Sequence, residues 1–386
     1  MKGLKVKSKR IFYIITSLDY GGTQKQLYIL LKTILETKEF NYEIFLISLK
    51  KNGRFRKKFT ALNIKIYDLC LSENNLVFNL LVLPLALLKL IFLFFYFQPN
   101  IVHSFLFQAN IFAKILKVLN PKVKLICSER VAEKQKKWQS LISRITNFLV
   151  DKFTVNSYDL KNFISISQKI KKEKIYVIHN TFLKEDFKVN LLPYKIRSYL
   201  GINENDFLVI SVGRLHKQKG FDLFLDIVRA FVEEVKLNGY KRNFLFLIIG
   251  DGKDKKFLVN YAKNLNVLSY VRFLGYIENI YDYINSCDLF ILTSYWEGSP
   301  NVILEALYFK KPVISTEVEG IKDYLDKNYI ISLNNKRKDI VANFVNKIMR
   351  FYLDEVKDYK ECINKNFEID FYNSEKIIKI FKKIYQ

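Results

Sequence analysis

The sequence predicts an α/β protein with two tandem Rossmann-like domains, whose parallel sheets face each other across a cleft. Its 386 residues are enough for two domains that each bury a core of their own. Hydrophobic residues make up 50% of the chain, and only 13 Gly and 6 Pro interrupt them. Short runs of Ile, Val, Phe and Leu alternate with longer helical patterns, which is typical of parallel strands joined by crossover helices.

The apolar runs form two series, and the pattern restarts after the polar stretch 191–206. We therefore expect an N-terminal domain over 1–195 and a C-terminal domain over 196–371. A last amphipathic helix over 372–386 needs a surface to cover. The expected strands are 11–17, 43–49, 100–105, 123–127, 153–156 and 175–178, followed by 207–212, 244–249, 271–274, 288–292, 312–315 and 329–331.

The segment 76–97 is the most ambiguous part of the first series. Only Asn79, Pro84 and Lys89 interrupt its apolar run, whose length is close to that of a membrane span. The two mid-run breaks, and the strand that follows at the distance of a crossover, favour a buried or membrane-touching helix over a spanning one. If its outer face is exposed, contact with lipid in the interface plane becomes an option.

The composition limits the kinds of partner that the protein can bind. With 63 Lys and Arg against 38 Asp and Glu, the net charge of +25 attracts nucleic acid, lipid headgroups or a phosphorylated substrate, although genome composition explains the Lys excess equally well. The four Cys and three His show no metal or redox spacing, so we expect no metal and no cofactor. The basic N-terminus leads into a short apolar run, which we interpret as the first strand and not as a secretion signal.

The strongest local pattern is the strand, loop, helix and strand unit of residues 288–315. Ser299 is a good N-cap, Pro300 fits the first helical position, and the helix can run from Asn301 to Phe309. The helix N-terminus, from Ser299 through Val302, therefore offers free amides to an anion such as a diphosphate.

Two carboxylates accompany this helix. Glu297 precedes it in the loop, and Glu305 lies in its second turn, so they point to different parts of one ligand. One can bond to sugar hydroxyls and the other to ribose hydroxyls. The alternative is a solvated loop acid and an ordinary helix acid.

A second pattern follows the strand 207–212. Gly213 lets the backbone approach closely, and Arg214 and Lys219 follow it before Gly220. A guanidinium and an ammonium together can neutralise the charge that builds on a leaving nucleotide diphosphate. The alternative is that both are surface cations of a Lys-rich chain.

Two weaker patterns line the same edge of the second sheet. Gly250 and Gly252 form a Gly-rich turn after one strand, and they can be simple turn residues. Gly275 and Tyr276 follow the next strand, where a base can rest on the backbone or on the ring.

In the first domain, Gly21 and Gly22 follow the first strand and can approach the phosphates of the ligand. They do not form a GxGxxG fingerprint, which argues against a nicotinamide enzyme. His103 ends the strand 100–105, where it either faces the cleft or is a core histidine bonded to the backbone.

Taken together, these stretches resemble the family-four glycosyltransferases of GT-B fold. The matching motifs are the Gly pair at Gly21 and Gly22, VGRL with KG at 212–220, GDG at 250–252, FLG at 273–275 and the two glutamates eight positions apart. The resemblance implies that Arg214 and Lys219 bind the donor diphosphate, Glu305 the ribose and Glu297 the donor sugar. The last helix would cross back to the N-terminal domain.

The resemblance also implies the reaction. A hexosyl or N-acetylhexosaminyl group would pass, with retention of configuration and without a metal, from a UDP- or GDP-sugar to a lipid-linked or glycan acceptor. The work would be surface polysaccharide synthesis at the cytoplasmic membrane face, with the enzyme peripheral to the membrane and no nucleic acid as partner.

Two departures concern the acceptor side. The family often has a His after the strand 123–127, where this chain has Ser128, Glu129 and Arg130. The HxH sometimes seen at the preceding strand is here His103, Ser104 and Phe105. We take His103 as a catalytic cleft residue.

Two rival functions remain at this point. A nucleotide-sugar epimerase on the same fold would turn over its donor without an acceptor. A non-catalytic basic protein would bind nucleic acid in a salt-sensitive way, but no aromatic and basic recognition motif supports it.

Overall fold

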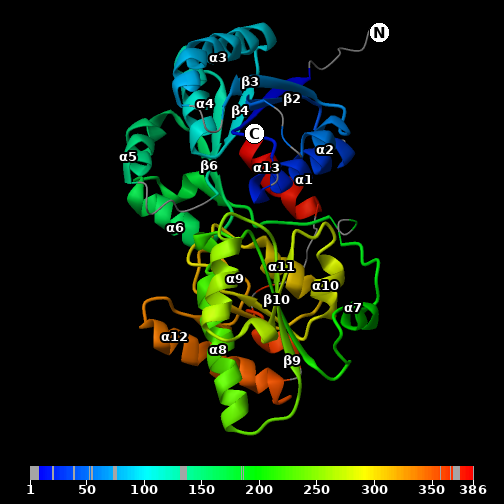
Figure 1. The fold of residues 1–386 in the computed structure, drawn as a ribbon. Helices are drawn as coiled ribbons and strands as arrows, with labels where there is room; N and C mark the ends of the chain where they lie inside the picture. The colour runs from blue at the N-terminus through cyan, green and yellow to red at the C-terminus, as the bar shows by residue number, and fades with distance from the viewer. Residues whose placement is uncertain are drawn as a thin grey trace. The chain divides into compact units, whose positions relative to one another are not determined.

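The computed structural model forms two compact units, each built on a parallel sheet. Unit 1 comprises Met1–Phe182 and Tyr372–Gln386, and unit 2 comprises Leu183–Phe371 (Figure 1). The predicted fold of two parallel-sheet α/β domains is confirmed. The residues described are 8–19, 21–37, 40–51, 53, 55–72, 76–130, 137–183, 185, 187–356, 358–365, 367 and 374–385.

Unit 1 has a seven-stranded sheet in the order β3-β2-β1-β4-β5-β6-β7. All neighbouring strands run parallel, as crossover helices require. The strands are β1 (Lys9–Ile15), β2 (Tyr42–Lys50), β3 (Lys65–Leu71), β4 (Ile101–Phe105), β5 (Lys124–Ser128), β6 (Lys152–Val155) and β7 (Ile175–Val177), and the helices are α1 (Gly22–Thr37), α2 (Arg56–Thr60), α3 (Leu76–Phe97), α4 (Phe107–Leu119), α5 (Lys137–Thr146), α6 (Tyr158–Ser167) and α13 (Ser374–Tyr385).

Both faces of this sheet are covered. One core contains side chains of α1 and α13, and Figure 1 shows these two helices together. The other core contains side chains of α3, α4 and α6. The central strands are therefore buried on both sides and read as continuous apolar runs, which is why the sequence predicts them. The edge strand β3 was missed, because its Lys65 and Asp68 break the apolar run.

Helix α3 forms over the predicted range with Pro84 inside it. Leu90 and Phe94 face the core, whereas Leu85, Leu88 and Phe92 are each more than 60% exposed. Among the residues that the structure describes, no helix combines the length and the apolarity that a membrane crossing requires.

The last helix, α13, belongs to unit 1. Its Tyr385 hydroxyl lies 2.7 Å from the Tyr13 hydroxyl of β1, and Ile384 is fully buried in the same core. Both tyrosines are buried, and burial raises the pKa of Tyr385 well above its ordinary value. The helix thus closes one face of the sheet with apolar and hydroxyl contacts.

Unit 2 has a six-stranded parallel sheet in the order β10-β9-β8-β11-β12-β13. All six strands begin and end within one residue of the predicted ranges. They are β8 (Phe207–Val212), β9 (Phe244–Ile249), β10 (Val271–Gly275), β11 (Leu289–Leu292), β12 (Val313–Thr316) and β13 (Ile330–Ile331), with helices α7 (Pro193–Tyr199), α8 (Phe221–Leu237), α9 (Lys255–Asn264), α10 (Tyr281–Ser286), α11 (Asn301–Tyr308) and α12 (Arg337–Tyr352).

The segment 183–195 lies with unit 2, although the sequence pattern assigns it to the first domain. The backbone amides of Asn190 and Leu191 donate to Asp282 Oδ1 at 2.7 and 3.1 Å. Phe187 stacks on Tyr308 with ring centroids 4.0 Å apart. These contacts join residues about a hundred positions apart, so no local periodicity reports them.

Candidate functional site

The carboxyl edge of the unit 2 sheet brings together two of the predicted residues. Lys219 Nζ lies 2.5 Å from Glu297 Oε1, although 78 positions separate them in the sequence. The stem of Lys219 crosses the backbone of Gly213, because a Cβ there would stand 3.2 Å from its Cγ and Cδ. Arg214 is exposed at the same strand end, where it is open to a ligand.

Glu297 is not a solvated loop acid, since it is only 8% exposed. Ser294 Oγ donates to the same Oε1 at 2.7 Å, so this oxygen accepts from a hydroxyl and from an ammonium. The two loops are also joined through their backbones, because the Tyr295 amide donates to the Gln218 carbonyl at 2.8 Å. The ion pair is therefore held by a rigid loop arrangement.

Helix α11 begins at Asn301, with Pro300 as its N-cap. The expected Ser299 cap and the helical position of Pro300 are thus wrong by one residue. The hydroxyl of Ser299 lies 2.9 Å from the Tyr324 hydroxyl, and the cap residue makes no side-chain bond to the helix. Asn301 and Val302 form the first turn and are half-buried, which leaves a helix N-terminus of the predicted kind.

Glu305 lies in the second turn of α11 and is 6% exposed. Burial of a carboxylate is costly unless a partner compensates it, so Glu305 is not an ordinary surface acid of a helix. With Glu297, it gives the α11 region two buried carboxyl groups.

The predicted glycines make close backbone contacts. A Cβ on Gly252 would stand 2.4 Å from the Leu215 carbonyl oxygen, and one on Gly250 would stand 1.9 Å from that of Gly213. The Gly250 amide donates to the Gly275 carbonyl at 2.8 Å, which ties the ends of β9 and β10 together. Tyr276, the next residue, is 67% exposed and its ring is accessible.

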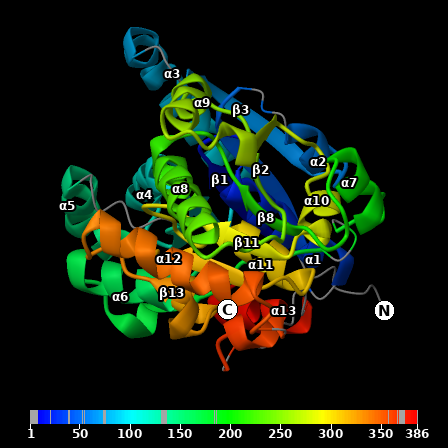
Figure 2. The ribbon, with the colours of Figure 1, turned by 60° about the horizontal axis from the view of Figure 1, so that its bottom comes forward.

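Sequence reasoning missed a polar cluster behind these loops. Arg337 of α12 bonds to the Tyr295 hydroxyl at 2.9 Å and to Asp222 Oδ2 at 3.0 Å, and Tyr295 donates to the same Asp222 oxygen at 2.7 Å. Figure 2 shows α12 lying beside α8, the helix that carries Asp222. Since Tyr295 precedes Glu297 by two residues and Asp222 follows Lys219 by three, the cluster fixes both loops of the ion pair.

The same cluster borders a pocket of about 570 Å³. Its lining combines cations, two Asp and aromatic rings, and it contains none of the residues named from the sequence. No local spacing signals this pocket, because Arg337 lies more than a hundred residues from Asp222. The lining residues are His216, Lys217, Phe221, Asp222, Lys253, Asp254, Phe257, Leu258, Tyr295 and Arg337.

In unit 1, His103 does not face open space and the expectation of a cleft residue is wrong. It is fully buried, with Nδ1 2.9 Å from the Tyr385 hydroxyl and Nε2 2.9 Å from Ser128 Oγ. Burial, and then the positive charge of Arg130, lower the pKa of His103 well below its ordinary value. The structure thus places it as a core histidine, bonded to side chains.

This burial predicts a specific pH dependence. Folded His103 stays neutral while the unfolded chain binds a proton below a pH of about 6.5, so its contribution is present above that pH and is lost on acidification. We expect unit 1 to lose stability through this residue as the pH falls below about 6.5, by at most about 1.4 kcal/mol for each pH unit. Hydrogen exchange of the β4 amides measures the loss. It should largely vanish in His103→Gln, and an unchanged pH slope would contradict the assignment.

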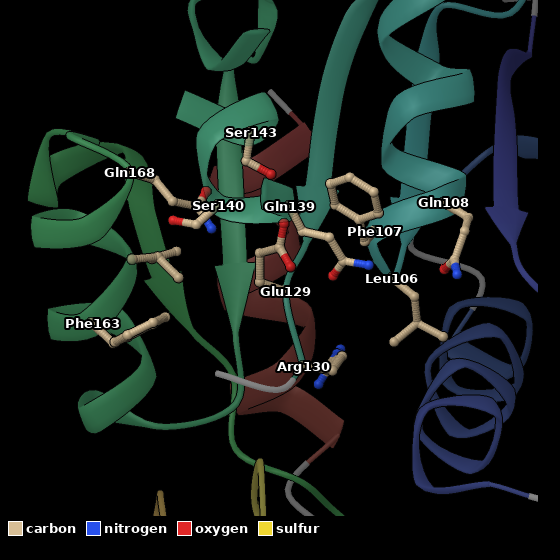
Figure 3. A pocket seen from close by; sticks show the side chains of 11 residues that line it. Leu106, Phe107, Gln108, Glu129, Arg130, Gln139, Ser140, Ser143, Phe163 and Gln168 are labelled. Atoms are coloured by element: carbon tan, nitrogen blue, oxygen red, sulfur yellow. The ribbon is translucent and has the colours of Figure 1, made fainter. Parts of the chain in front are cut away.

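Other predicted residues of unit 1 lie at strand ends. Gly22 is the first residue of α1 and follows the loop after β1. Glu129 and Arg130 come directly after β5 and border a small pocket of about 120 Å³ (Figure 3). Arg130 is 7% exposed, and its guanidinium lies over the Phe105 ring at 5.5 Å. After β5, where the resembling family often has a His, this chain therefore has a buried cation beside a pocket.

Within the described residues, no group of three or more His, Cys, Asp or Glu is arranged to hold a metal ion. Arg214, Lys219 and the N-terminus of α11 place positive charge at the unit 2 edge.

Residues 194–368 match the family model of glycosyl transferases group 1, and they lie within unit 2. This part of the chain is therefore similar to the group 1 glycosyl transferases. The matched range includes Arg214, Lys219, Glu297 and Glu305, so the part-buried ion pair lies inside it. The family and its named relatives support a transferase.

Two relatives act in glycan assembly by their names. An Escherichia coli UDP-Gal:alpha-D-GlcNAc-diphosphoundecaprenol alpha-1,3-galactosyltransferase is 31% identical over 202 residues, 50% of this chain and 49% of the relative. The chain thus spans about half the length of that enzyme. A Campylobacter jejuni GalNAc-alpha-(1->4)-GalNAc-alpha-(1->3)-diNAcBac-PP-undecaprenol alpha-1,4-N-acetyl-D-galactosaminyltransferase is 25% identical over 380 residues, 90% of this chain and 96% of the relative.

The fold also has solved counterparts. Anabaena HepE, whose crystal structure holds UDP and glucose, superposes with a TM-score of 0.72 at 16% identity, covering 97% of this chain and 98% of HepE. At this identity the likeness shows the fold, which is that of GT-B proteins.

Proposed function

We propose that this chain transfers a hexosyl or N-acetylhexosaminyl group from a nucleotide-sugar to a lipid-linked or glycan acceptor in surface polysaccharide synthesis. The observation that carries the proposal is the part-buried pair of Lys219 and Glu297, which lies in the loops after two strands of the matched range. A part-buried ammonium beside a buried carboxylate gives one group for a phosphate and one for a sugar hydroxyl.

The roles follow from position. Arg214 and Lys219 would hold the diphosphate together with the first amides of α11, while Glu305 would bind the ribose. Glu297 would bind the donor sugar. The acceptor oxygen would bond to the anomeric carbon on the face from which the phosphate leaves, and the acceptor proton would pass to the leaving phosphate oxygen. Configuration would be retained, and the fixed positive groups would stabilise the leaving diphosphate without a metal.

The named relatives and the solved counterpart suggest the partners. HepE was crystallised with UDP and glucose, and the E. coli relative is named for UDP-Gal, so a UDP-sugar donor is preferred to a GDP-sugar. Both relatives are named for diphosphoundecaprenol-linked acceptors, which supports a lipid-linked acceptor here. Such an acceptor lies at a membrane, and we place the enzyme at the cytoplasmic face as a peripheral protein.

The donor site is tested by thermal shift on the full chain. At a UDP concentration of about a hundred times its Kd, binding to the folded state adds about 2.7 kcal/mol of stability. We expect this shift with wild type and its loss in Glu305→Ala, because the buried carboxylate would no longer bond to the ribose.

The matched control is Glu204→Ala, which removes an exposed acid of unit 2 and should keep the full shift. Comparison of UDP, GDP and ADP identifies the base. If none of these nucleotides stabilises the wild-type protein, the proposed donor site is refuted.

A further inference from the structure

Helix α5 and the short 3-10 turn after it, η1 (Asn147–Leu149), have inverted polarity. Their buried side chains are polar and include Gln139, Ser143 and Asn147, each less than 10% exposed. Their solvent side is apolar. We call it the α5 outer face, and its members with their exposed fractions are Trp138 (56%), Leu141 (57%), Ile142 (38%), Ile145 (63%) and Phe148 (79%).

Named polar contacts fix this orientation. Lys114 of α4 donates to Thr146 Oγ1 at 2.8 Å and to Asn147 Oδ1 at 2.9 Å. The side-chain amide of Asn147 donates in turn to Gln168 Oε1 at 2.9 Å. Gln139, Ser140 and Ser143 line the small pocket next to Arg130, as the side chains in Figure 3 show. Turning the apolar side inward would leave Lys114 buried without these acceptors.

The exposure of α5 differs in kind from that of α3. Helix α3 is apolar on every side, so some of its Leu and Phe side chains remain outside whichever face is buried. Helix α5 has a polar face and an apolar face, and it presents the apolar one to the surroundings. An exposed apolar helix face of this kind marks a contact with another apolar phase.

Charge identifies the contacting phase. The chain as a whole has a net charge of +25. Arg144 is exposed on α5 itself, between the apolar residues. Two copies of a chain with this net charge would repel each other, whereas anionic lipid headgroups would attract the chain. A basic helix with Trp and Phe on its apolar side is the type that lies in the plane of a lipid interface.

We propose that the α5 outer face docks in the plane of an anionic lipid surface, with Trp138, Ile145 and Phe148 entering the boundary between headgroups and acyl chains. The inner side of the same helix then places the pocket of Glu129 and Arg130 beside the headgroups. This deepens the proposed function, since the polar group of a lipid-linked acceptor lies at that level. Only this link to the acceptor rests on the proposed function; the docking itself does not.

The test is vesicle co-sedimentation of the full chain, with vesicles of phosphatidylglycerol and phosphatidylcholine or of phosphatidylcholine alone. Wild type should bind the anionic vesicles and bind the neutral ones at least about tenfold more weakly. The triple variant Trp138→Gln, Ile145→Gln and Phe148→Gln should weaken binding to anionic vesicles by at least about tenfold.

Two control variants also replace exposed apolar residues by Gln, but outside α5. Ile166→Gln alters a 78% exposed residue of α6 in the same unit and should leave binding within about twofold of wild type. Leu88→Gln with Phe92→Gln on α3 should weaken binding by less than about threefold. Undiminished binding of the α5 variant, or a loss confined to the α3 variant, would overturn the proposal. So would a concentration-dependent dimer that the α5 variant abolishes, because a second copy would then cover the face.

The nucleotide thermal shift on the same samples separates this proposal from the proposed function. A variant that loses vesicle binding but keeps both the Tm and the UDP shift of wild type is folded and supports the docking. Wild type that binds anionic vesicles through α5 but shows no nucleotide shift would uphold the docking and refute the donor site.

Discussion

Replacement of Glu297 by Gln is expected to lower the turnover of sugar transfer by about 10² to 10³-fold. Gln keeps the shape of Glu297 and can still accept from Ser294 Oγ, which lies 2.7 Å from Oε1. The substitution removes the negative charge beside Lys219, where the donor sugar is proposed to bind. Loss of a charged group weakens a contact more than loss of a neutral one, so the effect on turnover should exceed that of a lost neutral hydrogen bond.

The kinetic pattern distinguishes this role from a general loss of structure. Because Lys219 and Arg214 remain, the nucleotide portion should still bind, and the Kd for UDP should stay within about threefold of wild type. The fall should appear in kcat. The measurement is initial-rate transfer from a UDP-sugar, together with UDP titration of the same preparation.

A matched carboxylate serves as control. Glu233 pairs with Arg229 at 2.9 Å on the surface of α8, where both side chains are more than half exposed. Exposed pairs contribute little, so Glu233→Gln should leave turnover within about twofold. Turnover of Glu297→Gln within about threefold of wild type would show that the buried carboxylate is not needed for transfer.

The elements that the sequence predicts well share a physical cause. Strands β8 and β9 of unit 2 are buried on both faces, so their apolar runs have sharp polar borders. The loops that follow them carry Gly and charged residues, and the carboxyl ends of parallel strands meet at one edge. The proximity of Lys219 and Glu297 could therefore be expected from topology, before any distance was known.

The failures come from contacts that no local pattern records. His103 is the middle residue of β4 and does not end the strand as predicted, and its Nδ1 lies 2.9 Å from a hydroxyl 282 positions later, on Tyr385. Likewise, Arg337 forms an ion pair with Asp222, which lies more than a hundred positions earlier in the sequence. Sequence periodicity gives the two faces of α5, yet which face turns inward depends on Lys114, which belongs to another helix.

The largest effect on stability is expected from Gly250→Ala. Gly250 has a φ of +144°, a conformation that side chains with a Cβ rarely adopt. A Cβ would also stand 1.9 Å from the Gly213 carbonyl oxygen. We expect unit 2 to lose more than about 3 kcal/mol, measured as a fall in Tm and in soluble yield.

Gly239→Ala separates the two causes, since Gly239 also has a positive φ of +66° but nothing lies within 4 Å of its Cβ position. Conformation alone should cost that variant about 1 kcal/mol. If both variants lost the same free energy of unfolding, the backbone of Gly213 would have moved away from the new Cβ at little cost.

We expect Gly250→Ala to lose more stability than Gly239→Ala, because hydrogen bonds and a close contact hold the backbone around Gly250 in place. Its amide donates to the Gly275 carbonyl at 2.8 Å, and the Gly213 amide donates to the Ile249 carbonyl at 3.0 Å. A shift that frees the new Cβ must break one of these bonds or displace Gly213, and the stem of Lys219 rests on Gly213. Any Gly250→Ala protein that does fold should therefore also show a weaker UDP thermal shift, because the strain passes directly to the cation proposed to hold the diphosphate.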